Sequence, residues 1–234
     1  MARCNYFIAL LPLCLILAGC SNKPTAIAAL TDAQSDSQLG LRLIETHQIA
    51  AARAKLTQGI IASSKASSPW YTLGYLEEVV GNNTAANADF RKAIALSPQS
   101  GPAHNNYGTF LCHRGKFNAA LTQFAIAVKE PKYYDLSAAY ENAGLCSLEN
   151  GKQDTAKSYF LAAVGAAPYM PHSLFELAFI FYNEKNFGQS QYYLDQYLSM
   201  IQTPGAKSKQ LRAYLKMKKH PALLQFLPEP IIES

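Results

Sequence analysis

A set of small and aromatic residues returns at a nearly constant interval along most of this chain of 234 residues. Each copy carries a glycine, then an alanine 12 residues later, a phenylalanine after four more and a second alanine after three more. In three successive copies these residues are Gly74, Ala86, Phe90 and Ala93; Gly108, Ala120, Phe124 and Ala127; and Gly144, Ala156, Phe160 and Ala163. A fixed period of this length indicates a stack of similar supersecondary units, each packed on its neighbours.

The pattern extends to six copies, which begin near residues 33, 67, 101, 137, 171 and 205. Period and residue types match the tetratricopeptide repeat, a helix-turn-helix unit of about 34 residues. We therefore expect an all-α chain over residues 31–234, in which about six helix pairs stack into a tetratricopeptide-repeat solenoid, a right-handed superhelix. Alternation of apolar and polar residues, which would indicate strands, never lasts more than a few residues.

The repeated glycines have a packing role in this architecture. We expect Gly74, Gly108 and Gly144 to lie where the two helices of one unit cross, because a larger side chain would push the helices apart. A second set of glycines is expected in the turn between the two helices, at residues 81, 115 and 151.

Two boundaries of the repeats can also be predicted. The third and fourth copies are separated by two extra residues, which predicts a longer loop around residues 130–136. Thr31 and Gln34 have the spacing of a capping box, so we expect the first helix to begin there. The outermost copies match the pattern less well, as expected for the ends of a solenoid.

The N-terminal segment has the shape of a secretory signal: a charged start, an apolar run too short to span a bilayer, and the closing tetrapeptide Leu-Ala-Gly-Cys. The tetrapeptide resembles a lipobox, where bacterial lipoprotein precursors are acylated on the cysteine and cut before it. We expect a lipoprotein signal peptide over residues 1–19, lipidation of Cys20 and a lipidated tether over residues 20–30. A plain signal peptide with a chance cysteine is the alternative. By resemblance to lipoprotein sorting, Ser21 favours the periplasmic face of the outer membrane.

Positive charge is concentrated near the end of the sequence. The chain has a formal net charge of +5, and six Lys and Arg residues lie between residues 205 and 220 with no acidic residue among them. The remainder is close to neutral and offers no basic footprint for nucleic acid. We expect the basic segment to be a solvated helix face, with contact to anionic lipid or to an acidic partner as the alternative.

The sequence lacks the patterns that catalysis or metal binding would require. Cys112 and His113 are adjacent, so on a helix their side chains diverge by about 100° and cannot act together as nucleophile and base. The other histidines fall in separate repeats, at His47, His104, His172 and His220. We therefore expect a protein that is no enzyme and has no metal, no cofactor and no small-molecule substrate.

Two cysteines are placed to form a disulfide. Cys112 and Cys146 both fall late on the first helix of adjacent repeats, and those helices are neighbours in a solenoid. In an oxidising periplasm such a pair closes a bridge if its Cα atoms come within about 4.4–6.8 Å. The alternative is two small buried hydrophobic residues.

Two segments of the third and fourth copies are more specific than the generic repeat. They read AHNNYGTFLCHRGKFNAALTQF over residues 103–124 and ENAGLCSLENGKQDTAKSYFLAA over residues 141–163. They resemble the type IV pilus biogenesis/stability lipoproteins PilF and PilW. The resemblance covers the lipobox and all the repeats, although the last repeat is shorter and more basic than the family leads us to expect.

The resemblance implies a pilotin, an outer-membrane lipoprotein that helps subunits of the pilus secretin, PilQ, to reach that membrane and multimerise there. The partners would then be secretin subunits and, through the lipid, the membrane itself. A periplasmic scaffold lipoprotein that docks peptidoglycan-processing enzymes fits the generic repeat equally well, and only the third and fourth copies favour the pilotin.

A partner-binding groove follows from the repeat register, because in such repeats positions 2, 5, 9, 12 and 13 of each unit usually face the concave side. The predicted groove residues are Tyr71, Tyr75, Asn105, Thr109, Glu141, Leu145, Phe175, Phe179 and Tyr182, with Glu78, His113, Glu149 and Asn183 at the same kind of position. This groove is aromatic at both ends and mixed in the middle. Core packing is the alternative role for any single aromatic residue, whereas several at repeat-related positions favour binding.

Overall fold

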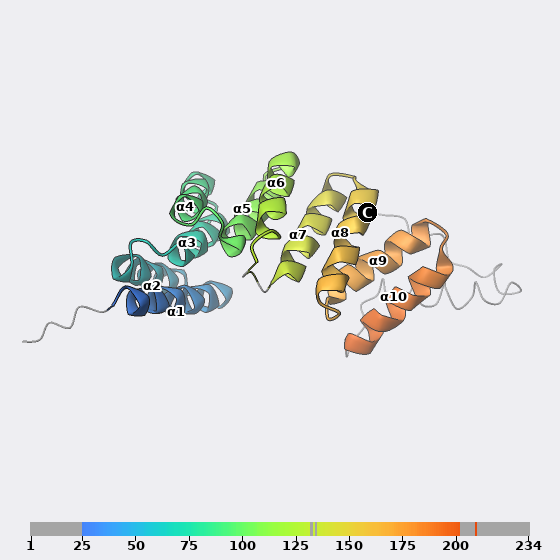
Figure 1. Ribbon diagram of the computed structural model, residues 1–234, viewed down its shortest axis with the longest axis horizontal. Helices are drawn as coiled ribbons and strands as arrows, with labels where there is room; N and C mark the ends of the chain where they lie inside the picture. Colours follow the sequence, from blue (N-terminus) through green and yellow to red (C-terminus); the bar gives the residue numbers. More distant parts are fainter. Residues whose placement is uncertain (1–24, 132, 134, 202–208, 210–234) are drawn as a thin grey trace, which may run out of the picture.

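The computed structural model describes residues 25–131, 133, 135–201 and 209. Within these residues the chain forms ten α-helices and no strand (Figure 1). The helices are α1 (Ala26–Glu45), α2 (Ile49–Ala62), α3 (Ser68–Val79), α4 (Asn83–Leu96), α5 (Gly101–His113), α6 (Phe117–Ala127), α7 (Leu136–Glu149), α8 (Gln153–Ala166), α9 (Pro171–Asn183) and α10 (Phe187–Met200). The predicted all-α class is confirmed.

Consecutive helices form five pairs, α1 with α2 through α9 with α10, and a turn of three residues joins the helices in each pair. The most extensive contacts in the molecule are those within the pairs, and each pair also packs against the next. The pairs follow one another from one end of the molecule to the other, as in a solenoid (Figure 1). They correspond to the first five predicted repeats, while the sixth, predicted from residue 205, lies outside the described residues except for Lys209.

The helices of each pair cross at a small residue, as predicted. In the three central pairs a glycine of the first helix lies against a phenylalanine ring of the second. An added Cβ would lie 3.0 Å from Phe90 at Gly74, 2.7 Å from Phe124 at Gly108 and 2.5 Å from Phe160 at Gly144. In the fifth pair the same places are taken by Ala178 and Leu194, both fully buried. A larger residue at the glycine positions would have to displace a buried ring.

The turns within the pairs also follow the prediction. Gly81, Gly115 and Gly151 have φ values of +80°, +68° and +67°, a left-handed conformation that glycine adopts without steric cost. In the first and fifth pairs the equivalent residues are His47 and Lys185, with φ values of +58° and +61°. The first and fifth pairs therefore have the same left-handed turn geometry, although their turns lack glycine at this position.

A longer loop joins α6 to α7, as the two extra residues predicted. It covers residues 128–135, whereas residues 97–100 suffice between α4 and α5. Tyr133 of this loop is buried against Gly101, where an added Cβ would lie only 2.5 Å from the tyrosine ring. The loop thus fills the space beside the start of α5.

The start of the first helix differs from the prediction. α1 begins at Ala26, and the Thr25 side chain caps it by accepting a hydrogen bond from the backbone N–H of Ala28. Thr31 lies inside the helix, where its hydroxyl donates to the Ile27 carbonyl oxygen, so the capping box at Thr31 and Gln34 is wrong. Residues 26–30, predicted as tether, are helical because their alanines and leucine favour helix without any periodic pattern.

Candidate protein-binding face

The five odd-numbered helices lie side by side, and each contacts the next. We call their predicted groove residues, from Tyr71 to Tyr182, the odd-helix face. It contains Tyr71 and Tyr75 on α3, Asn105 and Thr109 on α5, Glu141 and Leu145 on α7, and Phe175, Phe179 and Tyr182 on α9. All nine side chains are half-buried. Each therefore combines packing with a solvent-accessible part that a partner could contact.

At one end of this face, Tyr71 and Tyr75 pack against a core cluster that extends from the second to the fourth repeat. Burial raises the pKa of the Tyr71 hydroxyl above its ordinary value of 10.0, so the group remains a neutral donor and acceptor. Tyr71 also lines a shallow pocket that reaches α1 through Leu30 and Gln34. Tyr71 and Tyr75 therefore have a packing role, while their partial exposure leaves surface that a partner could contact.

The middle of the face is polar. The Asn142 side chain of α7 donates to Asn105 Oδ1 of α5 at 3.0 Å, which links the third and fourth repeats. Tyr133 of the long loop also hydrogen-bonds to Asn105, while burial raises the pKa of the tyrosine far above its ordinary value. The Thr109 hydroxyl donates within its own helix, to the Asn105 carbonyl oxygen at 3.2 Å. Asn105 is therefore held in place by residues from two other segments.

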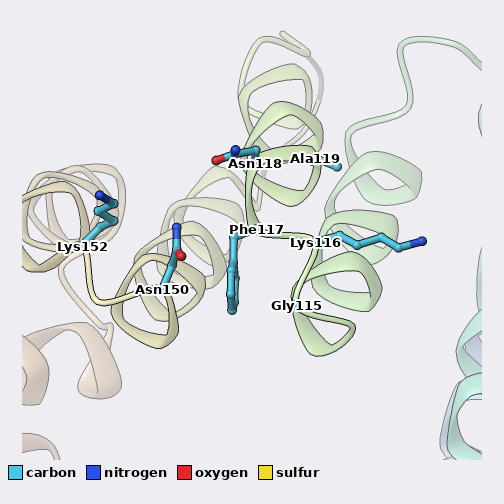
Figure 2. A pocket seen from close by; sticks show the side chains of 7 residues that line it. All are labelled: Gly115, Lys116, Phe117, Asn118, Ala119, Asn150 and Lys152. Atoms are coloured by element: carbon cyan, nitrogen blue, oxygen red, sulfur yellow. The ribbon is translucent and has the colours of Figure 1, made fainter.

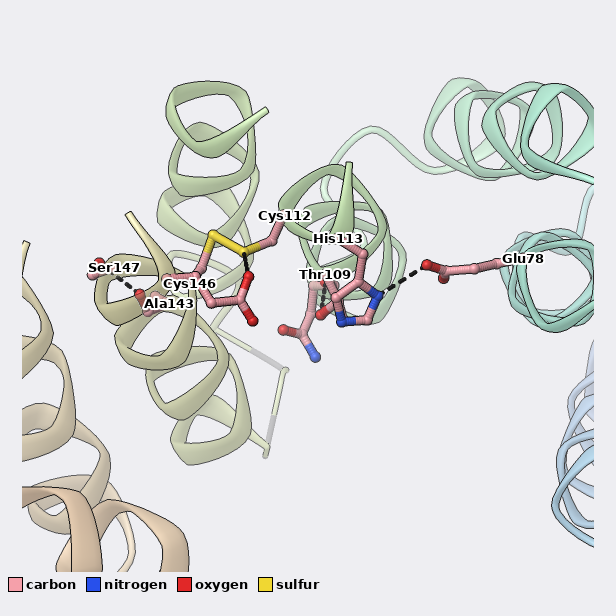
Figure 3. Close-up of a disulfide and its surroundings, with 9 residues drawn as sticks. Glu78, Thr109, Cys112, His113, Ala143, Cys146 and Ser147 are labelled. Atoms are coloured by element: carbon pink, nitrogen blue, oxygen red, sulfur yellow. Dashed lines mark hydrogen bonds and ion pairs between the residues drawn. A yellow bond between two sulfur atoms is a disulfide. The ribbon is translucent and has the colours of Figure 1, made fainter. Parts of the chain in front are cut away.

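A disulfide joins Cys112 of α5 to Cys146 of α7, with the Cα atoms 5.8 Å apart (Figure 3). Both cysteines are buried, and a small pocket beside them is lined in part by Thr109, Leu145 and Glu149. The bridge cross-links adjacent repeats directly at the odd-helix face. It limits how far α5 and α7 can separate.

Polar contacts also join α3 to α5 and α7 to α9. His113 Nδ1 of α5 lies 2.9 Å from Glu78 Oε1 of α3 (Figure 3). Glu141 of α7 accepts hydrogen bonds from the backbone N–H and the hydroxyl of Ser173 on α9, at 3.0 and 2.7 Å. Several predicted groove residues thus fix the spacing between helices. Sequence reasoning missed Ser173. The signal that could have found it is its place in the first turn of α9, where backbone N–H groups have no partner within the helix.

At the other end, the aromatic residues of α9 pack against one another and against α10. The ring centroids of Phe175 and Phe179 are 4.9 Å apart, and Phe175 lies 5.1 Å from Tyr197 of α10. Tyr182 lies 6.0 Å from Phe187, at the start of α10. Because these rings are half-buried, the cluster holds the fifth pair together and still presents apolar surface.

A third pocket, which the sequence did not indicate, lies at the turns of the third and fourth pairs (Figure 2). Its lining residues are Gly115, Lys116, Phe117, Asn118, Ala119, Asn150 and Lys152. The signal that could have found it is the Gly-Lys dipeptide that both turns share. Its two exposed lysines make the pocket basic, in contrast to the aromatic ends of the odd-helix face.

The other predicted positions are only partly described. Cys20 and all of the basic segment except the exposed Lys209 lie outside the described residues. His104 is a packing residue, since it is 3% exposed and its Nδ1 lies 2.7 Å from Gln123 Oε1. In the part of the chain that the structure describes, no three His, Cys, Asp or Glu side chains are grouped to hold a metal, and no helix has the length and apolarity needed to cross a membrane.

Family models of the tetratricopeptide repeat match residues 90–122 and 111–171, which cover the central helix pairs. The fold of this family serves protein–protein interaction, in agreement with half-buried aromatic and polar side chains along one face.

Two relatives match in sequence. An uncharacterized protein of Haemophilus influenzae is 27% identical over 140 residues, which are 59% of this chain and 78% of that protein. The type IV pilus assembly protein PilF of Pseudomonas aeruginosa is 25% identical over 158 residues, 68% of this chain. The match spans 63% of the length of PilF.

Solved structures show the same fold. That of Pseudomonas aeruginosa PilF has a TM-score of 0.74 at 22% identity, covering 85% of this chain and 90% of PilF. That of PilW, a type IV pilus biogenesis factor, has a TM-score of 0.67 at 24% identity, covering 83% and 90%. The chain contains tetratricopeptide repeats and is a homologue of the type IV pilus assembly protein PilF, with the fold that PilF and PilW share.

Proposed function

We propose that this protein is a pilotin-type lipoprotein of type IV pilus biogenesis. Acylated Cys20 anchors it to the periplasmic face of the outer membrane, and the odd-helix face binds subunits of the pilus secretin before they assemble into a ring. The observation that carries the proposal is the sequence match to PilF, which extends over 68% of the chain and is accompanied by a match in fold. The lipobox-like tetrapeptide before Cys20 supports the anchor.

The odd-helix face is suited to a single subunit segment. Its aromatic ends supply apolar contact area, and a fully buried aromatic side chain contributes about 1.5–3 kcal/mol. A few such anchors usually dominate an interface. Between them, Asn105 and Asn142 offer amide groups for hydrogen bonds to a peptide backbone. An extended or helical segment lying across α3 to α9 would contact both kinds of surface.

The contacts between neighbouring helices pre-organise the odd-helix face for binding. The disulfide, the Asn142–Asn105 hydrogen bond and the Ser173–Glu141 hydrogen bonds hold α5, α7 and α9 at fixed spacing. A partner that binds such a surface loses less free energy to ordering than one that must first assemble it.

The proposal is tested by complementing a deletion strain and measuring heat-resistant secretin multimers and surface pili. We expect Tyr71→Ala/Tyr75→Ala and Phe175→Ala/Phe179→Ala each to lower secretin multimers, because each removes two apolar anchors from the odd-helix face. Thermal melts must show that the variants fold, since these aromatic residues also pack against the core.

A matched control is Leu161→Ala/Tyr192→Ala, which removes exposed apolar side chains from the even-numbered helices α8 and α10. This variant should assemble secretin normally. Lys216→Glu/Lys219→Glu tests the basic segment in the same way. If both aromatic variants assemble normally and the charge reversal fails, the basic segment carries binding. If all variants and the deletion itself leave secretin intact, the pilotin role is wrong and a scaffold for peptidoglycan-processing enzymes becomes the better account.

A further inference from the structure

The first helix extends beyond the other odd-numbered helices at its N-terminal end. α1 has 20 residues, whereas α3, α5, α7 and α9 have 12 to 14. α5 begins at residue 101, the first residue of its repeat, while α1 begins at Ala26, seven residues before residue 33. At a rise of about 1.5 Å per residue, the extra turns project by about 10 Å.

This extension is apolar and exposed. It reads Ala-Ile-Ala-Ala-Leu, and the side chains of Ile27 and Leu30 are 77% and 46% exposed. Ile61, near the end of α2, is also 77% exposed. Ile61 lies at the same end of the first pair, because Gly59 of α2 packs against Asp36 of α1 and the two helices run in opposite directions.

The neighbouring loop adds positive charge. Leu30 and Ala66 line the same shallow pocket, so the loop between α2 and α3 lies beside the extension. This loop carries the exposed Lys65. No acidic residue occurs before Asp32 in α1. An apolar patch with an adjacent lysine matches the acyl chains and anionic headgroups of a membrane surface.

The short distance from the lipid anchor indicates that a membrane surface covers this patch. Cys20 precedes Ala26 by six residues. Six residues span at most about 20 Å, so an acylated Cys20 keeps the start of α1 at the bilayer surface. We propose that Ile27, Leu30 and Ile61 form a membrane-contact patch that seats the first helix pair on the lipid surface. The inference rests on the acylation of Cys20 in the proposed function.

The patch restricts how the odd-helix face is oriented on the membrane when it binds a secretin subunit. A lipid anchor alone leaves the protein free to rotate about its tether, whereas a second contact restricts its orientation. With the first pair on the membrane, the later repeats extend away from it. The membrane contact is weak by itself and is effective because the tether holds it close to the lipid.

Tryptophan fluorescence can locate the patch in the acylated full chain, reconstituted into phosphatidylethanolamine and phosphatidylglycerol vesicles that contain brominated lipid. Trp70 is the only tryptophan in the sequence, and its buried Nε1 finds no hydrogen-bond partner among the described residues, so Trp70→Phe gives a suitable background. Leu30→Trp is then compared with Leu161→Trp, since the two leucines are similarly exposed, at 46% and 40%.

We expect brominated lipid to quench the tryptophan at position 30 at least twofold more than that at position 161. Ile27→Trp should behave like Leu30→Trp and keeps the test valid if one variant misfolds. Equal quenching at all three positions, in protein that carries radiolabelled palmitate on Cys20, overturns the patch and leaves the anchor standing. Absence of palmitate on Cys20 overturns the anchor and the patch together. The secretin assays in cells test the pilotin role separately, and their result leaves the quenching comparison unaffected.

Discussion

The first two helix pairs meet through charged side chains, whereas the third and fourth are joined by a covalent bond. Arg53 of α2 pairs with Glu77 of α3, whose side chain is only 6% exposed. Asp89 of α4 lies close enough to both for their charges to shift its pKa. At the other junction, Cys112 and Cys146 connect α5 directly to α7.

The difference teaches that neighbouring repeats of one solenoid can depend on different chemical conditions. In a repeat protein the stability is approximately a sum over units and the interfaces between them, so each junction can be weakened separately. The charged junction should respond to pH, and the disulfide junction to reductant. The disulfide junction lies beside Thr109 and Leu145 of the odd-helix face, while the charged junction connects α2, α3 and α4.

The largest effect is expected at the disulfide. Removing it with Cys112→Ser/Cys146→Ser should lower the free energy of unfolding by about 2–4 kcal/mol, because the bridge constrains the unfolded chain. The two cysteines are separated by 34 residues in sequence. Urea unfolding followed by circular dichroism, with and without dithiothreitol, measures the effect. Reductant should destabilise the parent protein and leave the double variant unchanged; two reactive thiols in denatured, unreduced parent protein would show that no bridge forms.

A smaller effect is expected at the charged junction. Arg53→Met leaves the buried Glu77 carboxylate, among the described residues, with the Asn82 amide as its remaining side-chain donor, and should cost about 1–3 kcal/mol. Adding Glu77→Leu should recover much of this loss, because a buried ion pair can often be replaced by apolar residues. Arg91→Met, at an exposed arginine of α4, serves as the control. Non-additive melting temperatures in the double variant would support the pairing, while additive losses would contradict it.

The sequence predicts the elements that depend on the repeat period. Gly108 at the helix crossing and Cys112 beside Cys146 could be placed because both follow from one register, repeated at nearly constant spacing, whereas the structure adds that Gly108 meets the Phe124 ring. In each case, knowing which two helices are neighbours was sufficient to predict where the residues lie.

The remaining features depend on information that the period does not contain. The Arg53–Glu77 pair joins side chains of different repeats through particular rotamers, and no repeated pattern marks it. The early start of α1 comes from the helix propensity of Ala26 to Leu30, which have no register partner in later repeats. Register also places Phe175 on the odd-helix face, but only the structure reveals that the same ring packs on Tyr197.

The smallest effect concerns pH. Burial and the nearby Glu77 carboxylate raise the pKa of Asp89 from its ordinary 3.8 to about 6, against the opposing effect of Arg53. The folded chain therefore binds more protons than the unfolded chain between about pH 4 and pH 6, and the free energy of unfolding falls as the pH rises through this range. Asp89 is partly exposed, so solvent screening limits the effect to about 1 kcal/mol.

Asp89→Asn should remove this dependence and stabilise the protein at pH 7 relative to the parent. Urea unfolding at pH 4.5, 6 and 7.5 provides the comparison. Parent and variant curves that change in parallel with pH would assign the dependence to other groups. The Cys112→Ser/Cys146→Ser variant should keep the same pH dependence as the parent, because its altered junction lies elsewhere.

Contact between the odd-helix face and a secretin subunit is the central claim, and site-specific photocrosslinking in living cells tests it most directly. A photoreactive amino acid is placed at the half-buried Tyr75 or Phe179, or, as the control, at the more exposed Leu161 on the even-numbered helix α8. We predict secretin adducts from positions 75 and 179 and none from position 161. Adducts from position 161 alone, or from no position in cells that assemble secretin normally, would contradict binding through the odd-helix face.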